Sequence, residues 1–397
     1  MEILAGTTAI TKVEDRRASS VRSGIYVPLF PIAEWLVENW FFLWDEWRED
    51  APPERHSLLA AREGFALPDV TFRSTESNIE VAWRRLEAPL SRLEFLSSGT
   101  RLLEKAVVRE ECARLVEAVI RRLDEVKDLP SSAQRLQYDW VAILEATQDE
   151  EQRLFCERAA RLGVDPFAID DSLASQIEGL ENTLPVSLVD DFCDAIPASE
   201  FQHGVESIRS LLESLSSFDQ KGRWDEFRQK VQVAGSGPPW QIGYELAAAV
   251  REGLGLNGAV EGDPMDRLRQ ALGHPEVIEW STPRRIEAIL GKADTWPVVG
   301  MSRGLKEHKR RFLLARALGD YFAAGHPLLI TKGQSEHQQR NRAFAAEFLA
   351  PAASIRALIT SRRLDEEDIT ELAERFEVSS YVIRHQIKNH ELAEVAA

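Results

Sequence analysis

Histidine and carboxylate side chains gather around one strongly periodic segment, residues 306–324. His308, Asp320, His326 and His337 lie in or just beyond it, and neutral imidazole and carboxylate groups are usual protein ligands of Zn²⁺. A zinc ion held in this way can activate a water molecule for hydrolysis. No two of these histidines have the spacing of ligands on one helix or turn, so scattered surface histidines are the alternative interpretation.

Two other hydrolytic chemistries lack their usual residues. The chain contains no GxSxG sequence, which presents the nucleophilic serine of many hydrolases. Cys112, Cys156 and Cys193 form no CxxC unit, and none lies in a segment typical of a nucleophile. The sequence therefore favours neither serine nor cysteine catalysis.

Part of the periodic segment resembles a known family. Residues 311–321, RFLLARALGDY, are similar to the sequence RFxLAHELGHY on the metal-binding helix of the ImmA/IrrE zinc metallopeptidases. Residues 342–351, RAFAAEFLAP, are similar to the end of a second family sequence, EANxFAAELLMP, and residues 372–379, LAERFEVS, to a third, LAxxFxVS. The resemblance covers about residues 240–390 and leaves residues 1–235 unexplained. It implies a zincin-like domain, which in active members cleaves repressors or antitoxins.

The positions that hold metal in this family carry other residue types here. Arg316 and Asp320 stand where the resemblance places the two histidines, and Ala317 stands where it places the general base. The expected acidic ligand falls within residues 338–340, which are Gln, Gln and Arg. Arginine stays protonated and repels a dication, and alanine cannot take up a proton. The resemblance therefore implies a degenerate peptidase domain.

Two interpretations of this region remain open. In the first, Arg316 and Asp320, one helical turn apart, form an ion pair on the former metal face, and no cofactor is bound. In the second, His308, Asp320, His326 and His337 hold a relocated zinc ion, and the protein is an active metallo-endopeptidase that cleaves a repressor or antitoxin. We expect the first, because the whole ligand set is replaced together.

The chain is acidic as a whole but basic in one segment. Its 48 Lys and Arg residues and 65 Asp and Glu residues give a net charge of -17, whereas residues 300–363 carry a net charge of +8. We expect this segment to bind a protein partner in an electropositive cleft through Lys309, Arg316 and Arg342, the more accessible of its cations. Internal charge balance with the protein's own carboxylates is the alternative.

The C-terminal segment predicts a pair of helices of the helix-turn-helix type. Acidic residues 365–368 suit the first turn of one helix, and Ser379 is placed to cap the next. The side chains expected to face DNA are Tyr381, Arg384, Gln386, Lys388 and Asn389. The acidic residues of the first helix would repel phosphates, so packing or partner binding is the alternative to a transcriptional regulator.

The surrounding elements predict an α+β fold that is mostly helical. Residues 1–130 mix strand and helix patterns and are expected to form a small α/β domain of unknown role. Residues 131–235 predict a helical bundle, residues 236–362 the peptidase-like domain without metal ligands, and residues 363–397 the helix-turn-helix-like end. Gly235–Pro239 has the composition of a linker.

Two patterns in the first segment predict particular elements. Tryptophans at positions 35, 40, 44 and 47 recur at helical spacing among acidic residues. This favours a buried core helix over a membrane-interface or base-stacking surface. The runs Val70–Phe72 and Ile79–Trp83 flank Ser-Thr-Glu-Ser-Asn and predict a β-hairpin.

Composition favours a soluble cytoplasmic protein. Hydrophobic residues make up 44% and charged residues 28%, which is typical of globular chains. We expect no membrane contact, since no uncharged apolar run of membrane-spanning length and no leader segment occurs. Together with the resemblance, this predicts a role in stress, mobile-element or phage-defence regulation, including toxin-antitoxin systems.

Overall fold

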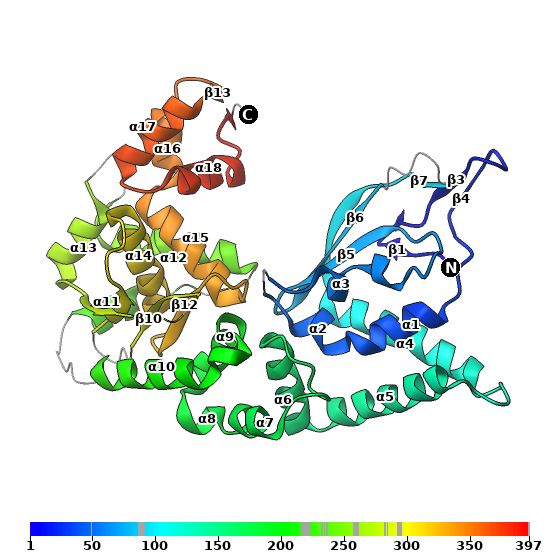
Figure 1. Cartoon of the computed structure of the whole chain (residues 1–397). Coiled ribbons are helices and arrows are strands. Elements are labelled where there is room, and N and C mark those ends of the chain that lie inside the picture. Colours follow the sequence, from blue (N-terminus) through cyan, green and yellow to red (C-terminus); the bar gives the residue numbers. More distant parts are fainter. Residues whose placement is uncertain are drawn as a thin grey trace. The chain divides into compact units, whose positions relative to one another are not determined.

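The chain folds into two compact units in the computed structural model, unit 1 (Met1–Glu178) and unit 2 (Gly179–Ala397) (Figure 1). The structure describes all residues except 49, 86–91, 216–222, 232, 234, 236, 257–261, 282, 284, 292–295 and 396–397. Each unit is built around its own hydrophobic core. The predicted α+β, mostly helical fold class is confirmed.

Unit 1 combines three small antiparallel sheets with helices. Their strand orders are β1-β2, β4-β3-β7 and β5-β6-β8. The strands are β1 (Leu4–Ala5), β2 (Thr8–Ala9), β3 (Val13–Asp15), β4 (Ser20–Arg22), β5 (Asp69–Ser74), β6 (Asn78–Arg84), β7 (Leu93–Phe95) and β8 (Gly99–Glu104). The helices are α1 (Phe30–Glu38), α2 (Trp40–Asp45), α3 (Pro53–His56), the 3-10 helix Leu58–Ala61, α4 (Lys105–Leu123), α5 (Ser131–Gln148), α6 (Glu150–Arg161) and α7 (Asp171–Glu178).

The tryptophan-rich segment forms the centre of the unit 1 core. Trp35, Trp40 and Trp44 are buried, as predicted, but the segment is divided into α1 and α2 at Asn39. Trp40 packs edge-on against Trp140 of α5, with ring centroids 4.8 Å apart, a favourable aromatic geometry. The predicted hairpin is also confirmed, since β5 pairs antiparallel with β6.

Unit 2 contains one four-stranded sheet among many helices. The helices are α8 (Leu180–Thr183), α9 (Val186–Ala195), the 3-10 helix Ala198–Glu200, α10 (Phe201–Leu215), α11 (Trp224–Lys230), α12 (Pro239–Gly253), α13 (Pro264–Leu272), α14 (Glu307–Ala323), α15 (Glu336–Leu349), α16 (Ala352–Leu358), α17 (Glu366–Phe376) and α18 (Ser380–Asn389). The strands are β9 (Glu276–Trp280), β10 (Ile286–Leu290), β11 (Val298–Ser302), β12 (Leu328–Thr331), β13 (Arg363–Leu364) and β14 (Glu394–Val395).

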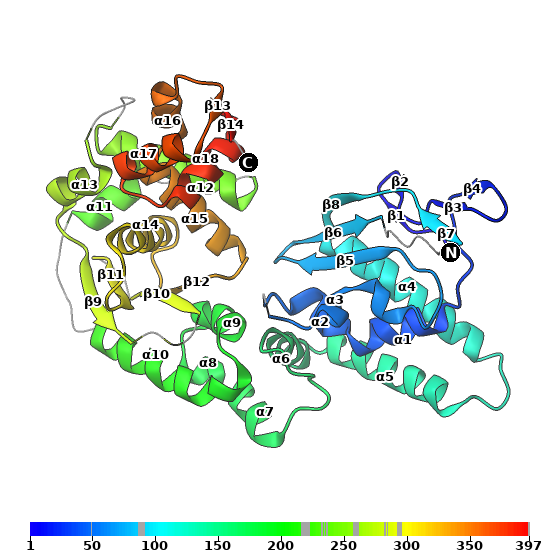
Figure 2. The same ribbon diagram turned by 45° about the horizontal axis from the view of Figure 1, so that its top comes forward.

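The unit 2 sheet has the strand order β12-β10-β11-β9, which leaves β12 at one edge. β10 pairs antiparallel with both β11 and β12, and β11 pairs parallel with β9. Helix α10 lies close to β11, and a Cβ on Gly300 would lie 2.7 Å from Leu211 of α10. Helix α14 packs along β10, and Figure 2 shows it beside the sheet. The β10–β12 strands are therefore largely buried, which agrees with their mostly apolar sequences, interrupted in β10 by Glu287.

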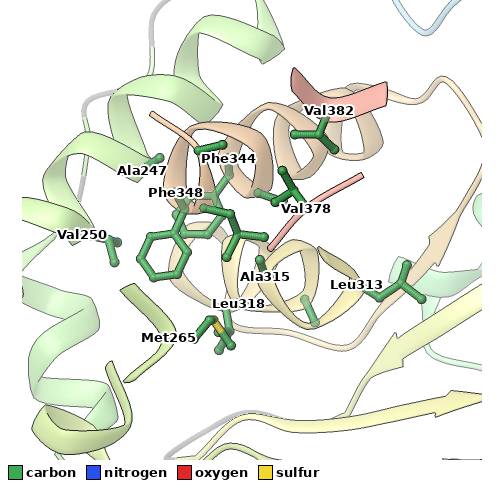
Figure 3. Packing of buried hydrophobic residues seen from close by; sticks show 14 of the residues in the cluster. Ala247, Val250, Met265, Leu313, Ala315, Leu318, Phe344, Phe348, Val378 and Val382 are labelled. Carbon is green, nitrogen blue, oxygen red and sulfur yellow. The ribbon is translucent and has the colours of Figure 1, made fainter. Parts of the chain in front are cut away.

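Helices α12, α14 and α15 enclose the unit 2 core (Figure 3). Ala247 of α12, Leu318 of α14 and Phe344 of α15 are among its fully buried members. Helices α12 and α15 approach closely at Gly243, where an added Cβ would lie 2.3 Å from the carbonyl oxygen of Arg340. Only glycine leaves room for this contact.

The segment boundaries expected from the sequence fall within the two units. The expected boundary after residue 130 lies in unit 1, between α4 and α5, and the boundary after residue 235 lies in unit 2, between α11 and α12. Of the expected linker, Ser236 is outside the described residues, and Pro239 already begins α12. Residues 363–395 contain the expected pair of C-terminal helices, α17 and α18.

The described part of the chain shows neither a membrane-spanning helix nor a disulfide bond. In the part of the chain with described structure, no helix is both long and apolar enough to cross a membrane. Cys112, Cys156 and Cys193 all lie within that part and form no disulfide.

Candidate functional site

Helix α14 carries the residues of the predicted former metal face. Arg316 and Asp320 lie one turn apart and are 2% and 0% exposed. The direct ion pair expected between them does not form, because Asn341 of α15 lies between the two side chains. Asn341 Oδ1 accepts a hydrogen bond from Arg316 Nε at 2.8 Å, and its Nδ2 donates one to Asp320 Oδ2 at 2.8 Å. An amide fits this place because it accepts at one end and donates at the other.

Arg316 forms the centre of a buried polar network. Its Nη1 pairs with Glu287 Oε2 of β10 at 3.0 Å. Its Nη2 donates to the carbonyl oxygen of Thr331 at 2.8 Å and to Gln338 Oε1 at 2.6 Å. Burial, followed by the charge of nearby Arg342, lowers the pKa of Arg316 to about 10, so the guanidinium remains protonated at neutral pH. All three of its nitrogens have an acceptor, as a buried cation requires.

Asp320 is surrounded by cations. Arg340 Nη2 lies 3.6 Å from Oδ1, and His337 Nδ1 lies 3.7 Å from Oδ2. These distances are too long for hydrogen bonds, and Oδ1 has no hydrogen-bond partner among the described residues. The carboxylate is thus stabilised by charge on one side and by the Asn341 amide on the other.

A second carboxylate reaches the same place from α9. Asp191 Oδ2 is hydrogen-bonded to His337 Nε2, and Asp191 Oδ1 accepts from Ser335 Oγ at 3.1 Å and from Gln338 Nε2 at 3.3 Å. Burial alone would lower the pKa of His337, but Asp191 and Asp320 outweigh it and raise this pKa to about 10. The ring is therefore an imidazolium held between two carboxylates, one at each nitrogen.

The free edge of β12 is also occupied by side chains. Gln338 Nε2 donates to the carbonyl oxygen of Leu329 at 2.7 Å, and its Oε1 accepts from the backbone N–H of Thr331 at 3.2 Å. Ser187 of α9 donates to the carbonyl oxygen of Pro327 at 2.6 Å. Alternate residues of an edge strand direct their backbone groups outwards. Side chains of the same unit therefore satisfy the positions where an added strand would bind.

Residues 284–388 match the model of the IrrE N-terminal-like domain of the M78 peptidases. This segment is therefore similar to the IrrE N-terminal-like domain. The resemblance predicted for about residues 240–390 is thus confirmed over the region that contains α14, α15, α16, α17 and nearly all of α18. Comparisons with curated proteins and with solved structures gave no significant match.

The zinc ion implied by the similarity to the peptidase family does not fit the residues of this segment. At the place of the ligands stand the Arg316 and Arg340 guanidinium groups and one carboxylate, Asp320. Guanidinium groups offer no lone pair to a metal, and they would repel a dication at this distance. In the described part of the chain, no group of three His, Cys, Asp or Glu side chains is arranged to hold a metal ion.

The side chains considered for a relocated zinc site do not converge in the domain. Asp320 and His337 are neighbours, but both nitrogens of His337 face carboxylates. His308 lies in the first turn of α14 and Asp320 in its last turns, about 18 Å away along a helix axis. His308 and His326 are exposed.

The basic side chains of the domain are largely balanced within it. Lys309 Nζ pairs with Glu287 Oε1 at 3.2 Å, and Arg342 donates to the carbonyl oxygen of Gly333 at 2.7 Å. The expectation that Arg316 is accessible is wrong, because this side chain fills the interior of the network. Arg316 and, to a large extent, Lys309 are therefore paired with carboxylates of the protein itself, as the alternative of internal charge balance predicts.

The expected DNA-facing residues of α18 divide into two groups. Tyr381 and Lys388 are exposed, whereas Arg384 pairs with Glu366 of α17. Asn389 is exposed and donates to the hydroxyl of Tyr244 of α12 at 3.2 Å. This face of α18 is therefore partly used for contacts within unit 2.

Gln386 is the exception to the outward orientation expected for these residues. It is 0% exposed and donates through Nε2 to Glu347 Oε2 at 2.7 Å and to the carbonyl oxygen of Ala350 at 2.9 Å. Glu347 also accepts from the backbone N–H of Ala352 at the start of α16. The amide is buried because it satisfies acceptors at the end of α15.

Sequence reasoning missed Glu287, Asn341 and Asp191. The first two have no motif, and only the fold brings them to Arg316. The burial of Asp191 could have been predicted from the sequence, since it lies beside Leu188 and Phe192 on the buried side of α9. A charged residue within an apolar helix stripe indicates a buried polar partner.

Proposed function

We propose that this protein is a non-catalytic relative of the M78 peptidases that acts by binding a protein partner. The observation that carries the proposal is the buried network around Arg316, which fills the metal position with fixed charges that already have partners. Ala317 adds to it, since alanine supplies no general base for a hydrolytic water.

The occupied edge of β12 supports the same proposal. Extended peptides commonly bind an exposed sheet edge through backbone hydrogen bonds. Here Gln338 and Ser187 use those backbone groups, and α9 lies against the strand. Presenting a peptide bond at this edge would require breaking several buried hydrogen bonds. A partner would therefore bind more readily on the outer surface of the domain, where Lys309 and Arg342 are candidate contacts.

The setting of this function is inferred from the family. We propose a cytoplasmic role in stress, mobile-element or phage-defence regulation, in which the domain binds a regulator or antitoxin without cleaving it. The absence of disulfides among three cysteines agrees with a reducing compartment.

Metal content tests the proposal. Full-length protein purified without chelators should contain less than about a tenth of an equivalent of zinc, because the guanidinium groups of Arg316 and Arg340 offer no lone pair to the metal and repel a dication. Inductively coupled plasma mass spectrometry provides the measurement. Close to one equivalent of zinc, lost in an Asp320→Asn, His337→Gln variant but kept in a His326→Gln control, would establish the relocated site and overturn the proposal.

DNA binding by α18 is a second candidate, favoured by the exposed Tyr381 and Lys388 on the second helix of the pair. Against it stand the Arg384–Glu366 pair, the buried Gln386 and the acidic first turn of α17. Electrophoretic retardation of genomic fragments that is lost in Lys388→Ala would support it; no retardation by the parent protein would exclude it.

A further inference from the structure

An open groove with aromatic walls lies on unit 2, outside the buried network. It has a volume of about 500 Å³ and is formed by α12, the start of α14, α15 and α18. Figure 2 shows α18 above α12 and α15. We call it the aromatic groove and define it by six of its lining side chains: Trp240, Tyr244, Gln339, Arg342, Tyr381 and Asn389. Its volume is within the range of sites that bind ligands.

The aromatic side chains of the groove are exposed yet held in place. Trp240 is 49% exposed and Tyr381 is 68% exposed, although both are large apolar residues. Trp240 packs edge-on against Tyr244, with centroids 5.8 Å apart, and Tyr381 lies against His385 at 3.9 Å. Rings fixed in this way lose little entropy when a ligand stacks on them. Exposed, pre-positioned aromatic rings are typical of binding surfaces.

Amide side chains supply hydrogen bonds between the rings. Gln339 donates through Nε2 to the carbonyl oxygen of Gln334, and Asn389 donates through Nδ2 to Tyr244. Within the described part of the chain, the amide oxygens of Gln339 and Asn389 have no hydrogen-bond donor. Such oxygens can accept from the backbone N–H groups of an extended peptide.

The groove differs in charge from the rest of this acidic protein. None of its lining residues is Asp or Glu, whereas Arg342 contributes a positive charge. Glu347, the carboxylate nearest to Gln386, is not a lining residue and accepts hydrogen bonds from Gln386 and from the backbone of Ala352. A carboxylate of a ligand could therefore approach Arg342, whose Nη2 also donates to the carbonyl oxygen of Gly333 and to Gln334 Oε1.

We propose that the aromatic groove binds an extended peptide segment of a partner protein that carries proline or aromatic residues next to an acidic residue. Proline or aromatic side chains would stack on Trp240 and Tyr381, since preformed extended segments dock on aromatic-lined grooves. The acidic side chain would pair with Arg342. This inference rests on the proposed partner-binding function and adds the surface and the chemistry of the partner.

Single-stranded nucleic acid is the other ligand class that stacks on aromatic side chains, but the groove suits it less. Such sites follow the phosphate backbone with a row of cations. The groove contains one arginine, and the whole chain carries a net charge of -17. The observations therefore favour a peptide.

Peptide selection followed by binding measurements tests the proposal. The probes are peptides enriched from a phage-displayed random library on the immobilised full-length protein, then labelled for fluorescence anisotropy. Enriched sequences should combine proline or aromatic residues with an acid. Trp240→Ala and Tyr381→Ala should each weaken binding by roughly ten- to thirty-fold, the usual effect of removing an aromatic anchor. Arg342→Gln should weaken binding and reduce its salt dependence.

Tyr138→Ala is the matched control, because Tyr138 is an exposed tyrosine of unit 1; it should leave binding unchanged. No enrichment, or peptides that bind Tyr381→Ala as tightly as the parent, would overturn the proposal. So would a single-stranded oligothymidylate that competes with the peptide and binds more tightly. These outcomes are distinct from those of the metal measurement. If the protein contains no zinc and selects no peptide, only the peptide-binding inference fails. If it contains stoichiometric zinc, the proposed non-catalytic function fails.

Discussion

At the scale of single residues, the imidazolium of His337 between Asp191 and Asp320 couples the stability of the protein to pH. Its pKa is about 10 in the folded protein, compared with about 6.5 for an unperturbed histidine. Between these values the folded state holds a proton that the unfolded state has lost. The stabilisation is therefore complete below about pH 6.5 and is lost as the pH rises towards 10.

We expect the free energy of unfolding of the parent protein to fall by a few kcal/mol more than that of His337→Gln between pH 6.5 and pH 9.5. Urea unfolding followed by circular dichroism at several pH values measures this difference. His326→Gln, which changes an exposed histidine, should retain the pH dependence of the parent. The same slope in His337→Gln and in the parent would show that the two carboxylates do not retain the proton.

Individual residues also show which features of the site can be predicted from the sequence and which cannot. The replaced ligand positions are visible in the sequence, because motif and numbering identify Arg316, Ala317 and Asp320 directly. The bridge through Asn341 and the contact with Asp191 are not visible, because they depend on how α15 and α9 pack against α14. A helix pattern also treats Gln386 as a surface residue, since polarity does not reveal a buried carbonyl partner.

At the scale of elements, the close approach of α12 and α15 depends on one glycine. Helix propensity alone makes alanine about 1 kcal/mol better than glycine inside a helix. In Gly243→Ala, however, the new Cβ would lie 2.3 Å from the carbonyl oxygen of Arg340 and 2.9 Å from Cβ of Ala343. Both neighbours are close to or part of the α15 backbone, so the two helices must separate.

We therefore expect Gly243→Ala to lower the free energy of unfolding by about 1–3 kcal/mol, the usual cost of overpacking. Thermal unfolding of the full chain followed by circular dichroism measures the change. Ala248→Gly, on the exposed side of the same helix, is the control and should cost only the propensity difference of about 1 kcal/mol. A Gly243→Ala protein more stable than the parent would mean that the helices lie further apart than described.

Helices and strands can be predicted from the sequence where a single periodic pattern specifies them. The hairpin of β5 and β6 and the C-terminal pair of α17 and α18 are of this kind, since turn residues and capping residues mark their ends. The tryptophan segment shows the limit: its burial was predictable, but its division at Asn39 was not. There the Asn39 side chain donates to the carbonyl oxygen of Trp35, which competes with helix continuation.

At the scale of the whole molecule, the sequence suggests a peptidase-like domain beginning near residue 236, whereas the structure joins residues 179–235 to the same unit. Trp224 of α11 is 0% exposed and packs against Tyr321 and Phe322 of α14. Helix α9 supplies Asp191 to the buried network. A boundary placed by composition alone cannot detect these contacts, because they join segments between 97 and 147 residues apart.

This difference leads to a prediction about fragments. Residues 179–397 expressed alone should unfold in a single cooperative transition, because the fragment keeps the whole unit 2 core. Residues 236–397 should lack such a transition, since they lose Trp224 from the core and leave Asp320 and His337 without Asp191. Removing a buried tryptophan side chain alone costs about 3–5 kcal/mol, a large part of the stability of a typical domain. Circular dichroism melting of the two fragments makes the comparison, and equally cooperative melting of both would show that α8 to α11 are not part of the folded core.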